Sequence, residues 1–154
     1  MKPIPDMIHV QIVNADTNEP VSNIVIMVRL FAIRKNDYSF IPCKSNDEGM
    51  IQITKVWLRD QVKKEQSLFI MDYWGSVDQC KPKMEFRIMS VTEINNAIKG
   101  MTEWKDFYNI SDAEIENLME VNNANYKPVT QIIDFHREDT VTIKLRIKVI
   151  SQGS

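Results

Sequence analysis

The chain has 154 residues and a formal net charge of −2. This length fits one domain whose hydrophobic core is large enough to need no disulfide or metal. Hydrophobic residues make up 44% and charged residues 26%, which is typical of a globular protein. The nearly balanced charge gives no overall attraction to nucleic acid or to an anionic membrane, so we expect neither as a partner.

The N-terminal segment lacks the apolar core of a secretory signal, and no window approaches the roughly 18 apolar residues of a membrane span. We therefore expect a cytoplasmic protein with no membrane association, while a signal sequence in the natural gene stays an open question. Cys43 and Cys80 are too few for a disulfide framework. They are either two buried free thiols or one bridge. No motif in the sequence indicates a cofactor.

The chain begins with a strand pattern. Residues 7–14 place Ile8, Val10 and Ile12 on one face, which is the period of two expected for a half-buried strand. A polar turn then leads into residues 24–33. These residues are apolar at every even position and largely apolar at the odd ones. The pattern predicts a central strand covered on both faces.

The next segments are short. The turn "SNDEG" ends at Gly49, which can adopt the left-handed backbone that such a turn needs. Residues 50–54 form a short strand. The spacing of apolar residues over 55–65 predicts a helix with one buried face. The apolar run at 67–71 predicts a buried strand.

Residues 83–89 alternate, and this predicts a strand with one apolar and one charged face. Met84, Phe86 and Ile88 are expected to face the core, and Lys83, Glu85 and Arg87 the solvent.

Two capping boxes come next, at Ser90–Glu93 and Ser111–Glu114. In each, a hydroxyl and a carboxylate can satisfy the free amides at a helix start. They predict a helical insertion over about 90–126.

The closing segment 140–150 has the longest alternation in the chain. Its inward residues are expected to be Val141, Ile143, Leu145, Ile147 and Val149, and its outward residues Thr140, Thr142, Lys144, Arg146 and Lys148. A clean solvent face predicts antiparallel pairing. The sequence thus predicts a single α+β domain over 1–154, mainly an antiparallel β-sandwich, with the helical insertion before the last strand.

Two turn motifs carry a resemblance to a known fold. "DTNEPV" at 16–21 precedes an apolar strand, and "SNDEG" at 45–49 precedes the next. This order resembles the transthyretin-like (prealbumin-like) and carboxypeptidase-regulatory-like β-sandwiches. The resemblance covers less than a third of the chain and implies a fold rather than a function.

The same fold group includes the 5-hydroxyisourate hydrolases, which offer a catalytic alternative. The chain is similar to them in His9 on the first strand and, loosely, in its "SQGS" ending. Met50 stands where that family usually has an arginine after the turn glycine. The resemblance implies a hydrolase centred on His9.

A second catalytic alternative involves His136 in "DFHRED". A histidine among carboxylates can hold a metal ion or act as an acid–base pair. Arg137 competes for those carboxylates, so a solvated connector before the last strand is the favoured interpretation of the segment.

Two features favour binding over catalysis. Tyr73 and Trp74 lie in a predicted loop, either as a partner anchor or as a cap on the core. The row Lys144, Arg146 and Lys148 is either a contact for an acidic partner or charge protection of an edge strand. Lys83 and Arg87 would extend this row if the two strands paired.

We therefore predict a noncatalytic protein-binding module that binds a protein partner or forms a homo-oligomer. A small bacterial accessory or immunity-type protein fits this description, since its composition, low in Gly and Ala and high in Lys, Ile and Asn, is typical of an AT-rich genome. The sequence identifies no catalytic residue and no metal ligand with a recognisable motif.

Overall fold

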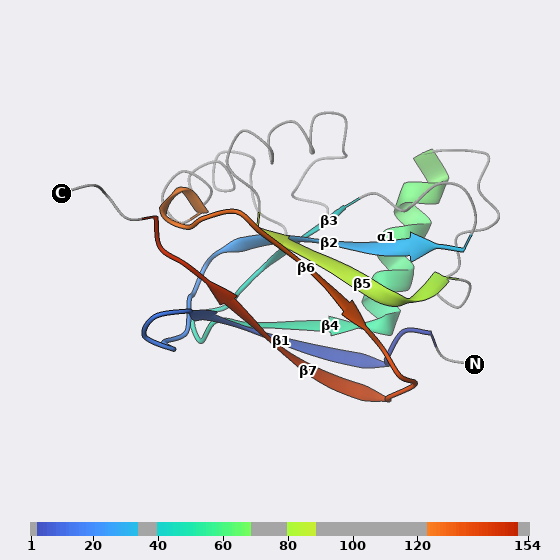
Figure 1. Cartoon of the computed structure of the whole chain (residues 1–154). Coiled ribbons are helices and arrows are strands. Elements are labelled where there is room, and N and C mark those ends of the chain that lie inside the picture. Colours follow the sequence, from blue (N-terminus) through green and yellow to red (C-terminus); the bar gives the residue numbers. More distant parts are fainter. Residues whose placement is uncertain (1–2, 34–39, 69–79, 89–122, 151–154) are drawn as a thin grey trace.

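Two β-sheets packed face to face make up most of the described protein (Figure 1). The computed structural model describes residues 3–33, 40–68, 80–88 and 123–150, with the backbone alone for 62–68. Its elements are β1 (Met7–Asn14), β2 (Val25–Ala32), β3 (Ile41–Lys44), β4 (Met50–Thr54), α1 (Lys55–Leu68), β5 (Cys80–Ile88), a 3-10 helix (Asn123–Asn125), β6 (Val129–Asp134) and β7 (Thr140–Ile147). One sheet has the strand order β4-β1-β7 and the other β3-β2-β5-β6. The predicted α+β sandwich is therefore confirmed at this level.

The core lies between the two sheets and is almost entirely aliphatic. On β1 the predicted inward residues Ile8, Val10 and Ile12 are fully buried, and on β5 so are Met84 and Phe86. A fully buried side chain of this size contributes roughly 1.5–3 kcal/mol relative to an exposed one. The alternation in the sequence thus identified the core correctly.

Strand β2 is central in its sheet, between β3 and β5. Its outward residues Val25 and Met27 are also buried, which confirms the prediction of a strand covered on both faces. Cys43 faces Ile26 on one side of β2, and Cys80 faces Ala32 on the other side, six residues further along the strand. Both are buried free thiols rather than a bridge.

Two turns hold the strand ends together. Gly49 has φ of 75°, as predicted, and its carbonyl accepts a hydrogen bond from the Ile12 amide at 2.8 Å. The Val21 amide donates to the Ile12 carbonyl at 2.9 Å, so the turns before β2 and before β4 meet at the same point of β1. The Ser45 hydroxyl, which is buried, donates to the Val21 carbonyl and accepts from the Ile24 amide. Polar turn residues therefore fix the relative position of the strands.

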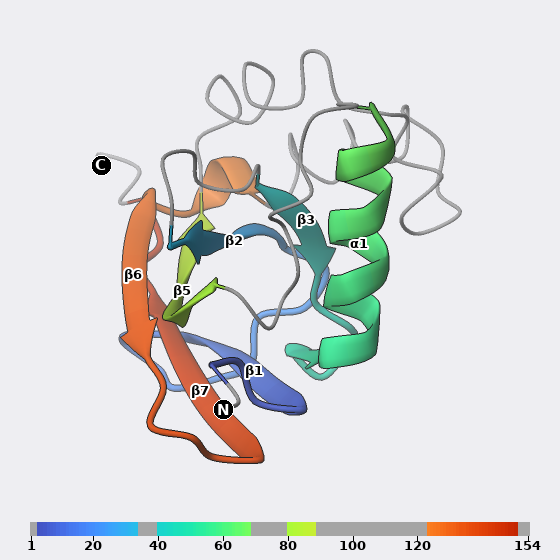
Figure 2. The ribbon, with the colours of Figure 1, turned by 90° about the vertical axis from the view of Figure 1, so that its right-hand side faces the viewer.

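Helix α1 covers one open side of the sandwich, next to β3 and β4 (Figure 2). The Thr54 hydroxyl accepts a hydrogen bond from the Trp57 amide at 3.0 Å and caps the helix start. Leu58 is fully buried and Trp57 packs against the core. The predicted helix is confirmed and runs on to Leu68, so the strand expected at 67–71 is wrong at its first two residues. Its other residues lie outside the described part.

Strand β6 was not predicted. Its inward residues include Gln131, so "VTQIID" lacks a continuous apolar face and only its pairing with β5 makes it a strand. The expected helical insertion at 90–126 lies mostly outside the described residues. Two strands, β6 and β7, come after this insertion, whereas the sequence predicted a single closing strand.

Strand β7 corrects the pairing prediction. It pairs in parallel with β1, from Met7 opposite Thr140 to Asn14 opposite Ile147. The connector after β6 carries the chain from one sheet to the other, and the Met7 amide donates to the Asp139 carbonyl at 3.2 Å. An alternating pattern reports a solvent face but not the direction of the neighbouring strand. The strand also ends early, and Val149, expected to face inward, is 43% exposed.

Candidate functional site

The edge strand β7 presents a row of exposed basic side chains. Lys144, Arg146 and Lys148 all lie exposed to solvent, the first two within the strand and the third just beyond its end. Because successive side chains of a strand alternate, Lys144 and Arg146 project to the same side, away from the buried Ile143, Leu145 and Ile147, and the exposed Lys148 follows directly after the strand. The structure thus places the row as the sequence predicted.

The neighbouring turn supports one member of the row. Arg146 stands opposite Val13 of β1, which is buried although it points away from the core. Val13 forms an isolated bridge with Pro20, where the turn folds back over the strand. From this turn Asn18 accepts a hydrogen bond from Arg146 Nη1 at 3.3 Å. A neutral amide therefore orients the guanidinium, and no carboxylate in the described ranges pairs with it.

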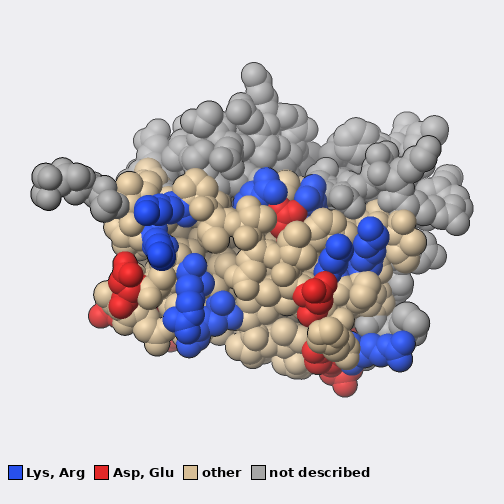
Figure 3. Space-filling model, in the orientation of Figure 1, with Lys and Arg blue, Asp and Glu red and all other residues tan. Residues whose placement is uncertain are grey.

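A fourth cation joins this row from another part of the chain. The Lys127 amide donates to the Lys148 carbonyl at 2.9 Å, which brings the exposed Lys127 alongside the end of the row. We call Lys127, Lys144, Arg146 and Lys148 the basic patch. No described carboxylate forms an ion pair with any of the four. Figure 3 shows one group of Lys and Arg at the end of the molecule where β7 ends and β6 begins, and further Lys and Arg at the opposite end. Sequence reasoning missed Lys127, because only tertiary pairing brings it to the basic patch.

The rest of this outer sheet face carries no carboxylate on its strands and mixes polar residues with the apolar Met7, Val13 and Met50. His9 stands in register with Gln52 on β4 and Thr142 on β7, and Gln11 stands beside Lys144. Neither neighbour of His9 can serve as a general acid or base at neutral pH. The described part of this face therefore gives His9 no catalytic partner within its strand pairs. The C-terminal "SQGS" of the hydrolase resemblance lies outside the described residues.

His136 lies exposed in the connector between β6 and β7. Its backbone amide donates to Glu138 Oε2 at 2.6 Å, and Arg137 between them has φ of 67°. The pKa of Glu138 is lowered by hydrogen bonds from its own amide and from that of His136, with a smaller contribution from the charge of His136. Within the described ranges, no group of three His, Cys, Asp or Glu side chains is placed to hold a metal ion. The carboxylate of Glu138 here shapes a turn.

Lys83 and Arg87 do not extend the basic patch. Their strand β5 belongs to the four-stranded sheet, between β2 and β6, and does not pair with β7. Glu85, predicted to face solvent, is only 2% exposed and lies between two arginines. The charged face of β5 is thus a separate cluster. Tyr73 and Trp74, the other predicted contact, lie outside the described residues.

Comparison with known proteins adds little. No family model and no curated protein sequence matches the chain. A 9R-lipoxygenase from Cyanothece PCC8801 is similar in structure at a TM-score of 0.35 and 16% identity, over 91% of this chain and 16% of that one. An (S)-allantoin synthase is similar at a TM-score of 0.39 and 8% identity, over 99% of this chain and 45% of that one. The chain thus spans less than half of either protein, and both similarities are too weak to bear on function.

The described part also contains no helix that is long and apolar enough to cross a membrane.

Proposed function

We propose that this protein is a noncatalytic recognition module that binds an acidic partner protein through the basic patch. The observation that carries the proposal is the exposure of four cations on and beside the end of edge strand β7, none of which forms an ion pair with a described carboxylate. Exposed charges of one sign raise association rates and select partners of opposite sign.

The distribution of charge over the whole chain supports this. Four of the 19 basic residues lie in the basic patch, so the remainder, with 15 basic and 21 acidic residues, carries a net charge of −6. The patch is therefore a local positive region on an otherwise acidic molecule. The net negative charge of the remainder disfavours nonspecific binding of an acidic partner, while the basic patch attracts it.

The same charges disfavour self-association through β7. An edge strand offers unpaired backbone groups to another strand, and lysines on the edge are a common protection against this. Two copies paired through β7 would bring two basic rows together, which is destabilising. An acidic partner removes this repulsion. We therefore favour a protein partner over a homo-oligomer formed at this edge.

Two finer inferences belong to the proposal. The turn motifs at 16–21 and 45–49 meet on β1, which supports a transthyretin-like arrangement of the N-terminal strands. The small size and single sandwich agree with an accessory or immunity-type protein of a bacterial system.

A pair of charge-reversal variants tests the proposal. The probe is a synthetic peptide of about ten residues, mostly glutamate, whose binding is measured by fluorescence anisotropy at low and at moderate salt. K144E/K148E reverses two charges of the basic patch, and K44E/K81E reverses two lysines of the other sheet. We expect the first to weaken binding by about tenfold or more and the second by less than about twofold, with binding falling as salt rises. Equal losses in the two variants would contradict the proposal.

A further inference from the structure

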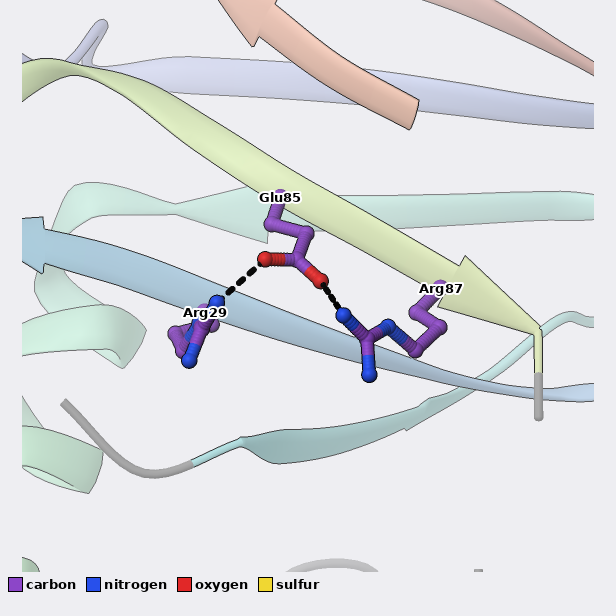
Figure 4. A network of polar contacts seen from close by, with 3 residues as sticks. All are labelled: Arg29, Glu85 and Arg87. Atoms are coloured by element: carbon purple, nitrogen blue, oxygen red, sulfur yellow. Dashed lines mark hydrogen bonds and ion pairs between the residues drawn. The ribbon is translucent and has the colours of Figure 1, made fainter. Parts of the chain in front are cut away.

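The second charged cluster lies on the outward face of the four-stranded sheet (Figure 4). Glu85 Oε1 accepts a hydrogen bond from Arg29 Nη2 at 2.5 Å, and Oε2 contacts Arg87 Nη2 at 2.5 Å as an ion pair. The two arginines come from neighbouring strands, β2 and β5, where Arg29 stands opposite Glu85. A single buried carboxylate therefore holds two guanidinium groups side by side.

Aromatic rings fix the cations further. Arg29 and Arg87 lie over the same ring, that of Phe40, at 4.7 and 4.9 Å from its centroid. Arg29 also lies 5.2 Å from the centroid of Phe31, and the ammonium of Lys83 lies 4.7 Å from that same centroid. Each contact restricts the cation without neutralising it. The three cations are thus held in place before any ligand arrives.

The cluster has more positive charge and more donors than it uses. On this face Asp134 of β6 stands opposite Lys83, so the three cations and the two carboxylates Glu85 and Asp134 leave an excess of one positive charge. The Nε atoms of Arg29 and Arg87 are buried and have no hydrogen-bond acceptor among the described residues. Nε and Nη2 form one edge of a guanidinium, and a carboxylate or phosphate bound side-on contacts both. Glu85 contacts only Nη2 of each arginine, so the Nε donor on the same edge has no bonded partner in this contact.

We propose that Arg29, Arg87 and Lys83 form a binding site for an oxyanion, specifically a phosphate group. A phosphate carries between about one and two negative charges at neutral pH and has several acceptor oxygens, so it can neutralise the excess positive charge and, after a shift of the guanidinium groups, accept from their unused Nε donors. The arginines remain 24% and 31% exposed, so solvent reaches their outer atoms. The ligand is either free inorganic phosphate or the phosphate of a small monoester.

This site is independent of the proposed function. It lies on the four-stranded sheet, whereas the basic patch belongs to β7 of the other sheet and to Lys127. A variant that abolishes binding of the acidic peptide can therefore leave phosphate binding intact, and the reverse.

Isothermal titration calorimetry of the full chain tests the site. Inorganic phosphate and glycerol 3-phosphate are titrated separately, at constant ionic strength adjusted with NaCl. We expect saturable binding with one site per chain, and the tighter of the two ligands identifies free phosphate or a monoester as the source. R87K should weaken binding by about tenfold, because an ammonium cannot make the side-on contact. K83M should weaken it by about fivefold through loss of one charge.

The matched control is K144M, the same substitution in the basic patch. Its phosphate affinity should equal that of the unaltered protein. Thermal unfolding of each variant verifies that it is folded at the temperature of titration. Absence of saturable binding in the folded, unaltered protein would overturn the proposal. Equal weakening by K83M and K144M would do so as well, because it would indicate a general charge effect.

Discussion

The basic patch and the Arg29–Glu85–Arg87 cluster use the same kinds of side chain in opposite ways. Both come from strands in which charged residues alternate with core residues. In the basic patch the cations are exposed and without ion pairs to described carboxylates. In the cluster they contact a buried carboxylate and two aromatic rings. The contrast teaches that the charged face of an alternating strand can either stay exposed to solvent or become buried in ion pairs. The groups that pack against the face decide between these two outcomes.

The largest difference between the two regions should appear in stability. Replacing Glu85 with Ala leaves two guanidinium groups close together without their counter-charge. Because both arginines are partly exposed, we expect a loss of about 2–3 kcal/mol, below the value for a fully buried pair. K144A should change the free energy of unfolding by less than about 0.5 kcal/mol. Urea unfolding measures the free energy of unfolding of both variants. Comparable losses in the two would contradict the proposed difference between the cluster and the basic patch.

Exchanging arginine for lysine sharpens the comparison at a smaller scale. In the cluster, R87K removes a planar group that lies over Phe40 and contacts Glu85, so we expect a loss of about 1 kcal/mol. In the basic patch, R146K keeps the positive charge that attracts the acidic peptide and loses one weak hydrogen bond to Asn18. It should leave stability and acidic-peptide binding nearly unchanged. Thermal unfolding and anisotropy are the measurements, and a marked loss of peptide binding in R146K would show that guanidinium geometry matters there too.

The smallest expected change in stability concerns Glu138, in the connector that joins the two sheets. Hydrogen bonds from two backbone amides lower the pKa of Glu138 in the folded protein. A lowered folded pKa adds stability above the unfolded pKa, and this stability is lost as the pH falls through the folded pKa. E138Q should therefore be slightly less stable than the unaltered protein at pH 7 and equal to it at about pH 2–3. Urea unfolding at both pH values checks this, and a difference that grows on acidification would have the wrong sign.

Local patterns predicted much of the fold. The alternation of Ile8, Val10 and Ile12, the buried odd face of β2 and the positive φ at Gly49 all follow from chemistry within a few residues. The parallel pairing of β7 and the existence of β6 do not, because each depends on a partner strand distant in the sequence. Periodicity cannot report the direction or identity of that partner.

The candidate site shows the same division. Lys144, Arg146 and Lys148 were predicted from their spacing alone, since exposed alternate residues of one strand share a face. Lys127 was missed because a single backbone hydrogen bond to Lys148 brings it there. Glu85 was misplaced for a related reason: its pattern is that of a solvent face, whereas Arg29 from β2 and Arg87 from its own strand surround it. The sequence shows which side chains are charged, but it does not show whether each charged side chain is exposed or buried in an ion pair.

The central claim is that the basic patch, and not the Arg29–Glu85–Arg87 cluster, contacts an acidic partner. A titration of the isotope-labelled chain with the glutamate-rich peptide, monitored by backbone amide NMR shifts, tests it most directly. We predict that the largest shifts fall on Lys144, Arg146, Lys148 and Lys127, with little change at Arg29 and Arg87. Shifts centred on Arg29 and Arg87, or no saturable shift at the basic patch, would contradict the account.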